Sequence, residues 1–373
     1  MKKLGLLLLL TPLMLSACGQ NTTKKEDQEL KDKIAQMLIV GFRGTELTPD
    51  SHIYNDIKEL NIGGVILFEY DAPTKSRPRN ITSEEQVTKL NADMQAIAKT
   101  PLFISIDQEG GKVNRLKDSY GFPVTVSAQY LGSVNNADTT AIWADRTAEL
   151  LARMGVNLNF APSVDVNVNP ENPIIGKIER SFSNDPSVVA NNARIWVDEH
   201  RRHGVISSLK HFPGHGSSKA DTHLGLADIT DTWTDAELIP YKTLITEGNC
   251  DMIMTSHVFN SKLDSVYPAT LSKAILTGVL RDSLGFNGVI VTDDMAMGAI
   301  VQHYSFEDAL EKTINAGADM LILSNNGKDY DPQVAQKAID IIFTFVKDGK
   351  IPAQTIDGAY NRIMALKKTY NLL

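Results

Sequence analysis

Residues 288–294 read GVIVTDD, an apolar run rich in β-branched side chains that ends in two carboxylates. Such a run is typical of a strand buried on both faces, as in a parallel sheet. Similar runs recur along the chain, and each ends in polar residues. Together with the first they cover residues 36–42, 64–68, 102–106, 156–160, 205–209, 252–255, 289–292 and 320–323.

Amphipathic segments of helical length lie between these runs, at residues 83–97, 139–154, 187–202, 271–284, 306–316 and 332–346. Thr234 and Glu237 have the spacing of a capping box and predict a further helix start. Alternating strands and helices indicate a parallel sheet covered by helices. Eight such units favour a single-domain α/β fold, a TIM-type (β/α)8 barrel with enlarged loops. The alternative is an open doubly wound sheet, but its G-x-G-x-x-G turn does not follow the first predicted strand.

The composition is that of an ordinary globular protein: 373 residues, 42% hydrophobic and 22% charged, with a formal net charge of −8. These values exclude collagen-like, disordered and multi-span membrane proteins. The charge pattern has no basic stripe, so we expect no nucleic-acid partner.

The N-terminus has the features of a targeting segment. Residues 4–15 form an apolar run after two lysines, shorter than the roughly 20 residues of a membrane span. LSAC at residues 15–18 resembles the bacterial lipobox, in which the cysteine becomes a lipid-carrying N-terminus. We therefore predict a signal peptide at residues 1–17, lipidated Cys18 with a tether at residues 18–27, and a catalytic barrel at residues 28–373. The alternative is an ordinary signal peptide with an incidental cysteine.

Polar residues follow the predicted strands, where a barrel places its active site. They are Glu69, residues 107–111, Asp165, residues 210–216, His257, Asp293 and Asp294. Because side chains alternate along a strand, we expect only one of the last two carboxylates to face the barrel mouth. The other is expected to cap the next helix.

A long aperiodic segment, residues 211–233, follows the fifth predicted strand, and such loops are usually functional. Asp221 and His223 lie two residues apart in it. In a turn, such a carboxylate reaches the imidazole and raises its pKa, which suits a proton donor and acceptor. The alternative is a mobile surface histidine beside an unrelated aspartate.

Four segments resemble family 3 of the glycoside hydrolases, specifically the bacterial β-N-acetylglucosaminidases (β-hexosaminidases) that act on peptidoglycan fragments. The segments are IDQEGGKVNR at 106–115, ERSF at 179–182 followed by DP at 185–186, KHFPGHG at 210–216 followed by DTH at 221–223, and TD at 292–293. The resemblance extends over essentially the whole mature chain.

The resemblance implies a retaining exo-hydrolase that works through a covalent glycosyl-enzyme. Asp293 would be the nucleophile, and His223 the acid/base with Asp221 as its partner. The loop at residues 210–223 would close over the sugar, and neither a metal nor an organic cofactor is implied. The terminal N-acetylglucosamine would be held by Asp107, Arg115, Arg180, Lys210 and His211.

The predicted lipid anchor, together with the family resemblance, gives an expected setting for the enzyme. We expect a monomeric, membrane-anchored lipoprotein outside the cytoplasm, with an N-acetylglucosamine-containing glycan as substrate. The chain has no room for the C-terminal α/β domain of larger family members, which favours the single-barrel form and counts against the β-glucosidase branch. Lys112 stands where the family usually has arginine, Ser217-Ser218-Lys219 differs from the usual acidic and small residues, and Thr222 replaces serine.

Several alternatives stay open from the sequence. The same fold could be a metal-dependent amidohydrolase, or an enzyme with Lys210 as a Schiff-base lysine. The chain could also be a glycoside phosphorylase, a β-glycosidase with another sugar preference, or a non-catalytic, lipid-anchored glycan-binding protein. The natural aglycone and the length of the glycan are not fixed by the sequence.

Overall fold

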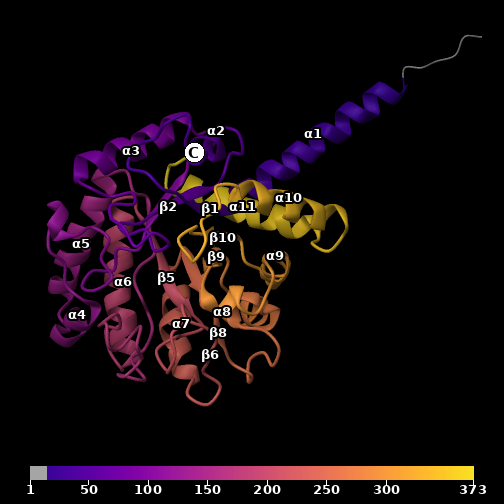
Figure 1. The fold of residues 1–373 in the computed structure, drawn as a ribbon. Helices are drawn as coiled ribbons and strands as arrows, with labels where there is room; N and C mark the ends of the chain where they lie inside the picture. The colour runs from indigo at the N-terminus through magenta and orange to yellow at the C-terminus, as the bar shows by residue number, and fades with distance from the viewer. Residues whose placement is uncertain (1–14) are drawn as a thin grey trace, which may run out of the picture.

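The computed structural model describes residues 15–373, and its centre is a closed barrel of parallel strands (Figure 1). The strand order around the barrel is β1-β10-β9-β7-β5-β4-β3-β2. The bounds are β1 Leu38–Gly41, β2 Gly64–Leu67, β3 Phe103–Ile106, β4 Leu158–Asn159, β5 Ile206–Phe212, β7 Met252–Thr255, β9 Val289–Asp294 and β10 Met320–Leu323. The predicted single-domain (β/α)8 barrel is confirmed, and the open doubly wound sheet is excluded.

Each of the eight predicted apolar runs corresponds to one barrel strand. Seven of the strands are buried along their whole length, as expected where helices cover the outer face and side chains fill the interior. β5 and β9 extend beyond their runs because Phe212 pairs with Thr255 and Asp294 pairs with Ile322. These extensions carry polar residues of the two strands to the rim of the barrel.

Helices surround the barrel, and five of the predicted ones are found within two residues of their expected ends (Figure 1). Those five are α3 Glu84–Ile97, α5 Ala137–Arg153, α6 Pro186–Arg202, α9 Phe306–Ala316 and α10 Val334–Lys347. The remaining α-helices are α1 Leu15–Gln36, α2 His52–Lys58, α4 Ala128–Val134, α7 Ile239–Thr246, α8 Gly298–Val301 and α11 Ala353–Thr369. Short 3₁₀ turns lie at η1 Asp118–Tyr120, η2 Asp235–Leu238 and η3 Ala269–Leu271.

Two local predictions need correction. The predicted helix at residues 271–284 is a π-helix, η4 Ala274–Ser283, that follows the 3₁₀ turn η3. The predicted capping box does not form: within the described chain the Thr234 hydroxyl makes no cap hydrogen bond. Glu237 instead turns inward, where its carboxylate accepts hydrogen bonds from the backbone N–H groups of Gly216 and Ser217.

The N-terminal helix α1 reaches away from the barrel and is fixed at its other end beside α10 and α11 (Figure 1). Lys31 pairs with Asp340 of α10, and Lys33 pairs with Asp357 of α11. Cys18 lies on α1, whereas residues 1–14 of the predicted signal peptide are outside the described residues. Within residues 15–373, no helix combines the length and the apolar character needed to cross a membrane.

Candidate active site

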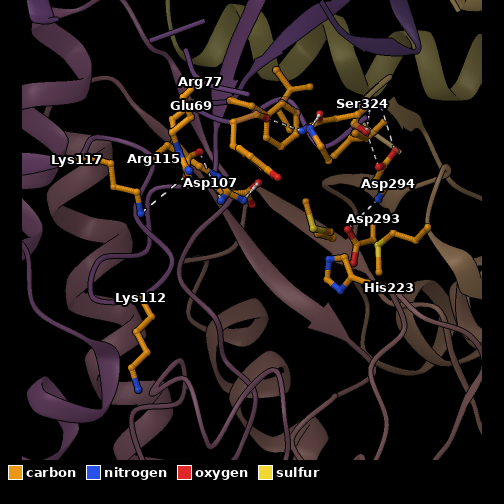
Figure 2. A pocket seen from close by; sticks show the side chains of 18 residues that line it. Glu69, Arg77, Asp107, Lys112, Arg115, Lys117, His223, Asp293, Asp294 and Ser324 are labelled. Atoms are coloured by element: carbon orange, nitrogen blue, oxygen red, sulfur yellow. Dashed lines mark hydrogen bonds and ion pairs between the residues drawn. The ribbon is translucent and has the colours of Figure 1, made fainter. Parts of the chain in front are cut away.

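Two cavities open at the carboxyl ends of the strands and share several walls (Figure 2). The larger has a volume of about 500 Å³ and the smaller about 180 Å³. Both are lined by Asp107, Arg115, His223 and Asp293, and the smaller adds Arg180, Lys210 and His211. The structure therefore brings together seven of the eight residues predicted for catalysis and sugar binding. The eighth, Asp221, lies behind His223.

Asp293 stands near the end of β9, after four buried residues of that strand. One of its carboxylate oxygens accepts a hydrogen bond of 2.8 Å from the backbone N–H of Asp294. Burial alone would raise its pKa, but the nearby imidazoles of His257, His211 and His223 hold the pKa below its ordinary value. Asp293 is thus kept as a carboxylate on a rigid support.

The neighbouring Asp294 has a different role from the expected helix cap. Its side chain accepts hydrogen bonds from the backbone N–H groups of Ala296 and Ser324, and from the Ser324 hydroxyl. It therefore joins the end of β9 to the end of β10. The N-cap position of α8 is occupied by Met297, so Asp294 does not cap that helix. Both carboxylates line the larger cavity, so the expectation that only one of them faces the barrel mouth is wrong, and the predicted cap is wrong as well.

His223 stands opposite, on the loop after β5, and points toward Asp293 in Figure 2. Its Nδ1 lies 2.7 Å from Oδ1 of Asp221, which also accepts the backbone N–H of His223 at 2.8 Å. The hydrogen bond to Asp221 raises the pKa of His223, and the charge of Asp293 adds to this against the effect of burial. The side chain of His223 is 61% exposed, so it contacts solvent as well as lining the cavity.

The tip of this loop rests on α8. The backbone N–H of Gly298 donates to the carbonyl of His223 at 3.2 Å, and that of Ala299 donates to the carbonyl of Thr222 at 3.1 Å. The side-chain amide of Gln302 donates to the carbonyl of Leu224 at 2.9 Å. Three hydrogen bonds therefore hold residues 222–224 in this structure, and His223 lines both cavities.

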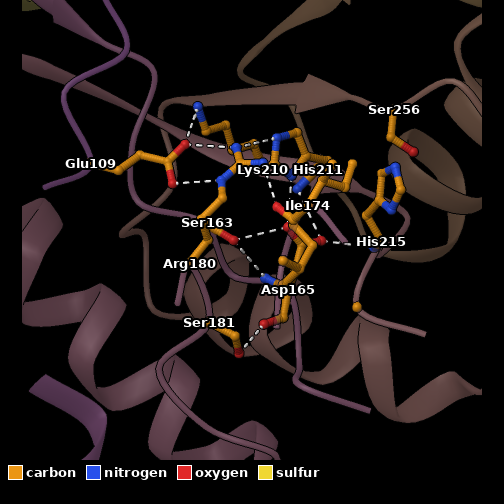
Figure 3. A network of polar contacts seen from close by, with 12 residues as sticks. Glu109, Ser163, Asp165, Ile174, Arg180, Ser181, Lys210, His211, His215 and Ser256 are labelled. Atoms are coloured by element: carbon orange, nitrogen blue, oxygen red, sulfur yellow. Dashed lines mark hydrogen bonds and ion pairs between the residues drawn. The ribbon is translucent and has the colours of Figure 1, made fainter. Parts of the chain in front are cut away.

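Paired charges form the wall of the smaller cavity (Figure 3). The Lys210 ammonium lies 2.8 Å from Asp107 and 2.7 Å from Glu109. The Arg180 guanidinium makes a bidentate pair with Glu109, with distances of 2.9 and 2.7 Å. Although burial opposes ionisation, Arg180 and Lys210 hold the pKa of Glu109 well below its usual range.

Asp165 is a second carboxylate that orients this wall. Its Oδ2 lies 2.6 Å from Nδ1 of His211, and its Oδ1 accepts the backbone N–H of His215 at 2.7 Å. Because Nδ1 of His211 donates its N–H to Asp165, Nε2 accepts the N–H of Arg180 at 3.0 Å. Asp165 therefore fixes the ring of His211 without lining either cavity.

Glu109 and Asp165 were not predicted as site residues, although the sequence carried signals for both. Glu109 lies inside the DQEGG segment, and Asp165 follows the fourth strand. His257, another strand-end residue, is fully buried between the Thr270 hydroxyl at 2.8 Å and the carbonyl of Asp294 at 3.0 Å. Burial lowers its pKa, and its hydrogen bond to the carbonyl of Asp294 supports the end of β9.

The three sequence departures lie in different surroundings. Lys112 is 52% exposed and pairs with Glu179 at 2.9 Å. Ser217 and Ser218 are buried within the loop, whereas Lys219 is exposed. Thr222 is buried, and its hydroxyl lies 3.3 Å from Nε2 of His215. Only Lys112 among these residues reaches the wall of the larger cavity.

Comparison with known proteins gives consistent matches. The sequence model for the glycosyl hydrolase family 3 N terminal domain matches residues 29–366. The beta-hexosaminidase of Tolumonas auensis is 34% identical over 294 residues, which are 78% of this chain and 83% of that protein. Beta-hexosaminidase A of Pseudoalteromonas piscicida is 36% identical over 289 residues, 72% of this chain. The matched region is 46% of that protein, so the chain spans about half of its length.

Among solved structures, a glycoside hydrolase family 3 beta-N-acetylglucosaminidase from Paenibacillus sp. str. FPU-7 superimposes with a TM-score of 0.83. It is 34% identical in sequence, and the match covers 92% of this chain and 63% of that one. The predicted enzyme class, a glycoside hydrolase of the β-hexosaminidase type, is therefore confirmed. The chain belongs to glycosyl hydrolase family 3.

Proposed function

We propose that the protein is a retaining exo-β-N-acetylglucosaminidase that removes terminal β-linked N-acetylglucosamine through a covalent glycosyl-enzyme. The observation that carries this proposal is the arrangement around one cavity. Asp293 stands on the rigid end of β9, and His223, paired with Asp221, stands on the loop opposite. Retaining hydrolysis requires such a nucleophile and such a proton donor at one scissile bond.

In the first step, a carboxylate oxygen of Asp293 attacks the anomeric carbon while the bond to the leaving oxygen breaks. Protonated His223 donates its proton to that oxygen, and the aglycone departs as an alcohol. The low pKa of Asp293 favours its ionised form, and the raised pKa of His223 favours its protonated form. The two groups thus hold the required protonation states together near neutral pH.

In the second step, His223 removes a proton from a water molecule that attacks the anomeric carbon of the glycosyl-enzyme. The bond to Asp293 breaks, the sugar leaves with its original anomeric configuration, and His223 is again protonated. Asp221 stabilises the imidazolium and orients the ring throughout, because it accepts from Nδ1. In both steps the transferred proton passes through the imidazole of His223.

Recognition of the sugar falls to the charged wall of the smaller cavity. Asp107 supplies an acceptor for hydroxyl groups, Arg180 and Lys210 supply donors, and Glu109 holds these two cations in place from behind the cavity wall. Hydrogen bonds to charged groups are stronger than those between neutral groups, and rigid ion pairs keep their geometry when the sugar is absent. These features support a site that selects the terminal sugar by its hydroxyl pattern.

The proposed setting is extracytoplasmic, with peptidoglycan fragments as the glycan and a lipid on Cys18 as the membrane anchor of a monomer. The support is the apolar leader and the LSAC sequence at residues 15–18, together with the family resemblance. Labelled palmitate should be incorporated by the wild-type chain in a bacterial host. Incorporation that survives Cys18→Ala would contradict the proposed anchor.

The activity is tested by incubating the mature chain, residues 18–373, with a panel of 4-nitrophenyl β-glycosides and with peptidoglycan fragments. We expect release of 4-nitrophenol from the β-N-acetylglucosaminide and of free N-acetylglucosamine from the fragments. Each assay is run with and without phosphate, because a phosphorolytic enzyme would give the sugar 1-phosphate. A 5-fluoro sugar should leave a covalent adduct on Asp293, and an adduct on any other residue would refute the nucleophile assignment.

A further inference from the structure

The base of the loop that carries His223 is held by two buried carboxylates. Asp165 accepts the backbone N–H of His215 at 2.7 Å. Glu237, from the 3₁₀ turn η2, accepts the next two N–H groups with one oxygen, those of Gly216 at 3.0 Å and Ser217 at 3.4 Å. Three successive amides thus point at fixed acceptors, and Glu237 itself is fully buried.

The loop approaches Glu237 so closely that only glycine fits at one position. Gly214 has a φ of +118°, and a Cβ atom there would lie 2.6 Å from the Cβ of Glu237. The indole N–H of Trp233 donates to the carbonyl of Pro213, the residue before Gly214, at 3.0 Å. The segment after the loop, residues 233–237, therefore forms a support on which the loop's first residues lie.

This support connects to the catalytic dyad through one side chain. Nε2 of His215, the residue before Gly216, lies 3.3 Å from the hydroxyl of Thr222 (Figure 3 shows His215 beside Asp165). Thr222 directly precedes His223, and both residues are held at the tip by backbone N–H groups of α8. A change in the position of Gly216 and Ser217 is therefore expected to move His223.

We propose that Glu237 is a positioning residue for the acid/base: it fixes the base of the loop and thereby places His223 against the leaving oxygen. This inference rests on the proposed function, in which His223 donates the proton. Glu237 lines neither cavity, so it does not contact the sugar. It affects catalysis by setting the position of His223.

The chemistry of the contact determines which variants are informative. Gly216 and Ser217 need an acceptor at the end of a three-carbon side chain, and glutamine supplies one without charge. Burial, together with the charge of Asp165, raises the pKa of Glu237 to about 7, so a neutral side chain is already compatible with this position. Glu237→Gln should therefore keep the loop in place. In Glu237→Asp the side chain is too short to reach Gly216 and Ser217, and in Glu237→Ala it has no acceptor.

The test compares these three variants with wild type on two β-N-acetylglucosaminides, one with a good leaving group (4-nitrophenyl) and one with a poor leaving group (phenyl). We expect Glu237→Ala and Glu237→Asp to lower kcat on the phenyl glycoside by about 10- to 100-fold, since small misplacements of a catalytic group cost this much. The 4-nitrophenyl glycoside should lose far less, and Glu237→Gln should be close to wild type on both. If Glu237→Ala does not fold, Glu237→Asp carries the comparison.

The matched control is Asp56→Ala, which removes another buried carboxylate, on α2, where it pairs with His52 at 3.0 Å. It should lower thermal stability without changing the ratio of the two kcat values. Equal losses on both substrates in the Glu237 variants, or the same ratio change in Asp56→Ala, would overturn the proposal.

The variant His223→Ala separates this inference from the proposed function. If His223→Ala shows no dependence on the leaving group, the acid/base assignment fails and the role of Glu237 fails with it. If His223→Ala shows the dependence and Glu237→Ala does not, only the inference fails. Because Glu237 acts through His223, the double variant should lose no more kcat than His223→Ala alone; additive losses would contradict the proposal.

Discussion

The end of β9 and the loop after β5 supply the two reacting groups from opposite kinds of surroundings. Asp293 follows a buried strand, and its neighbour Asp294 is tied to β10 by hydrogen bonds to Ser324. His223 is mostly exposed and is held by carbonyl contacts to the short helix α8. A nucleophile must keep one position through both steps, whereas an acid/base on a loop can arrive with the substrate and exclude water.

The largest effect is expected at the rigid end. Asp293→Asn removes the nucleophile, so kcat should fall by about 10⁴-fold or more on every substrate. Because no bond to the sugar forms without the carboxylate, a better leaving group should not restore turnover. Steady-state rates on the 4-nitrophenyl and phenyl β-N-acetylglucosaminides measure this, and thermal unfolding checks that the barrel is intact.

Asp294→Asn is the matched control for that variant, because it changes the adjacent carboxylate on the same strand. The amide oxygen of asparagine still accepts from Ala296 and Ser324, so activity should stay within about threefold of wild type. If kcat fell by a similar factor in Asp293→Asn and Asp294→Asn, activity would depend on the negative charge at the end of β9, and Asp293 would not be identified as the nucleophile.

The next effect is expected on the loop, and it should depend on the substrate. His223→Ala should lower kcat by about 10²- to 10⁴-fold on the phenyl glycoside, the usual contribution of a positioned proton donor. The 4-nitrophenyl glycoside needs little protonation and should lose far less. Equal losses on both substrates would remove the distinction between the two regions.

A smaller effect separates the partners of the dyad. Asp221 raises the pKa of His223, and His223 must be protonated to act as the acid. Activity therefore extends to higher pH than an unassisted histidine allows and falls as the pH rises through the raised pKa. In Asp221→Asn, the pKa of His223 should drop, and the basic limb of kcat/KM should move to lower pH by about one unit.

The pH profile of kcat/KM is measured on the phenyl glycoside. The 4-nitrophenyl glycoside depends too little on proton donation by His223 to report its pKa. Lys219→Asn, a change of charge on the same loop at an exposed position, is the control and should leave the limb in place. An unchanged limb in Asp221→Asn would show that Asp221 orients the ring without setting its pKa.

The barrel was predictable because its strands are buried on both faces and therefore leave short, uninterrupted apolar runs. The run at residues 289–292 identifies β9, and the polar residues after it identify the rim. Cap and turn details were not predictable in the same way. The spacing of Thr234 and Glu237 fits a capping box. The Glu237 carboxylate instead accepts hydrogen bonds from the backbone N–H groups of Gly216 and Ser217, which lie about 20 residues away in sequence.

The same contrast applies to the site. Residues that touch the sugar in the proposed function lie in contiguous segments such as DQEGG and KHFPGHG, which local reading detects. Asp165 and Glu237 act on backbone N–H groups of another segment, and only the folded chain brings them together. Apart from the place of Asp165 after the fourth strand, supporting residues of this kind leave no local pattern, because their partners are peptide groups that every residue carries.

The smallest effect concerns Lys112, where the family usually has arginine. Its ammonium pairs with Glu179 at 2.9 Å and with the carbonyl of Lys177 at 3.1 Å, at a half-exposed position. Exposed ion pairs are worth about 0.2–1 kcal/mol, so Lys112→Arg should leave kcat and KM within about twofold of wild type. In Figure 2 the side chain points away from Asp293 and His223, which agrees with a role in holding the loop after β3.

Arg115→Lys is the informative counterpart, because it makes a change of the same kind inside the cavity. The Arg115 guanidinium lies 3.4 Å from Asp107 and 3.8 Å from Glu69, and lysine cannot span both carboxylates with one planar group. Losing one hydrogen bond to a charged group should lower kcat/KM by about tenfold. If Lys112→Arg instead changed kcat/KM as much as Arg115→Lys, the ammonium of Lys112 would contact the bound glycan, and the larger cavity would select its aglycone through that contact.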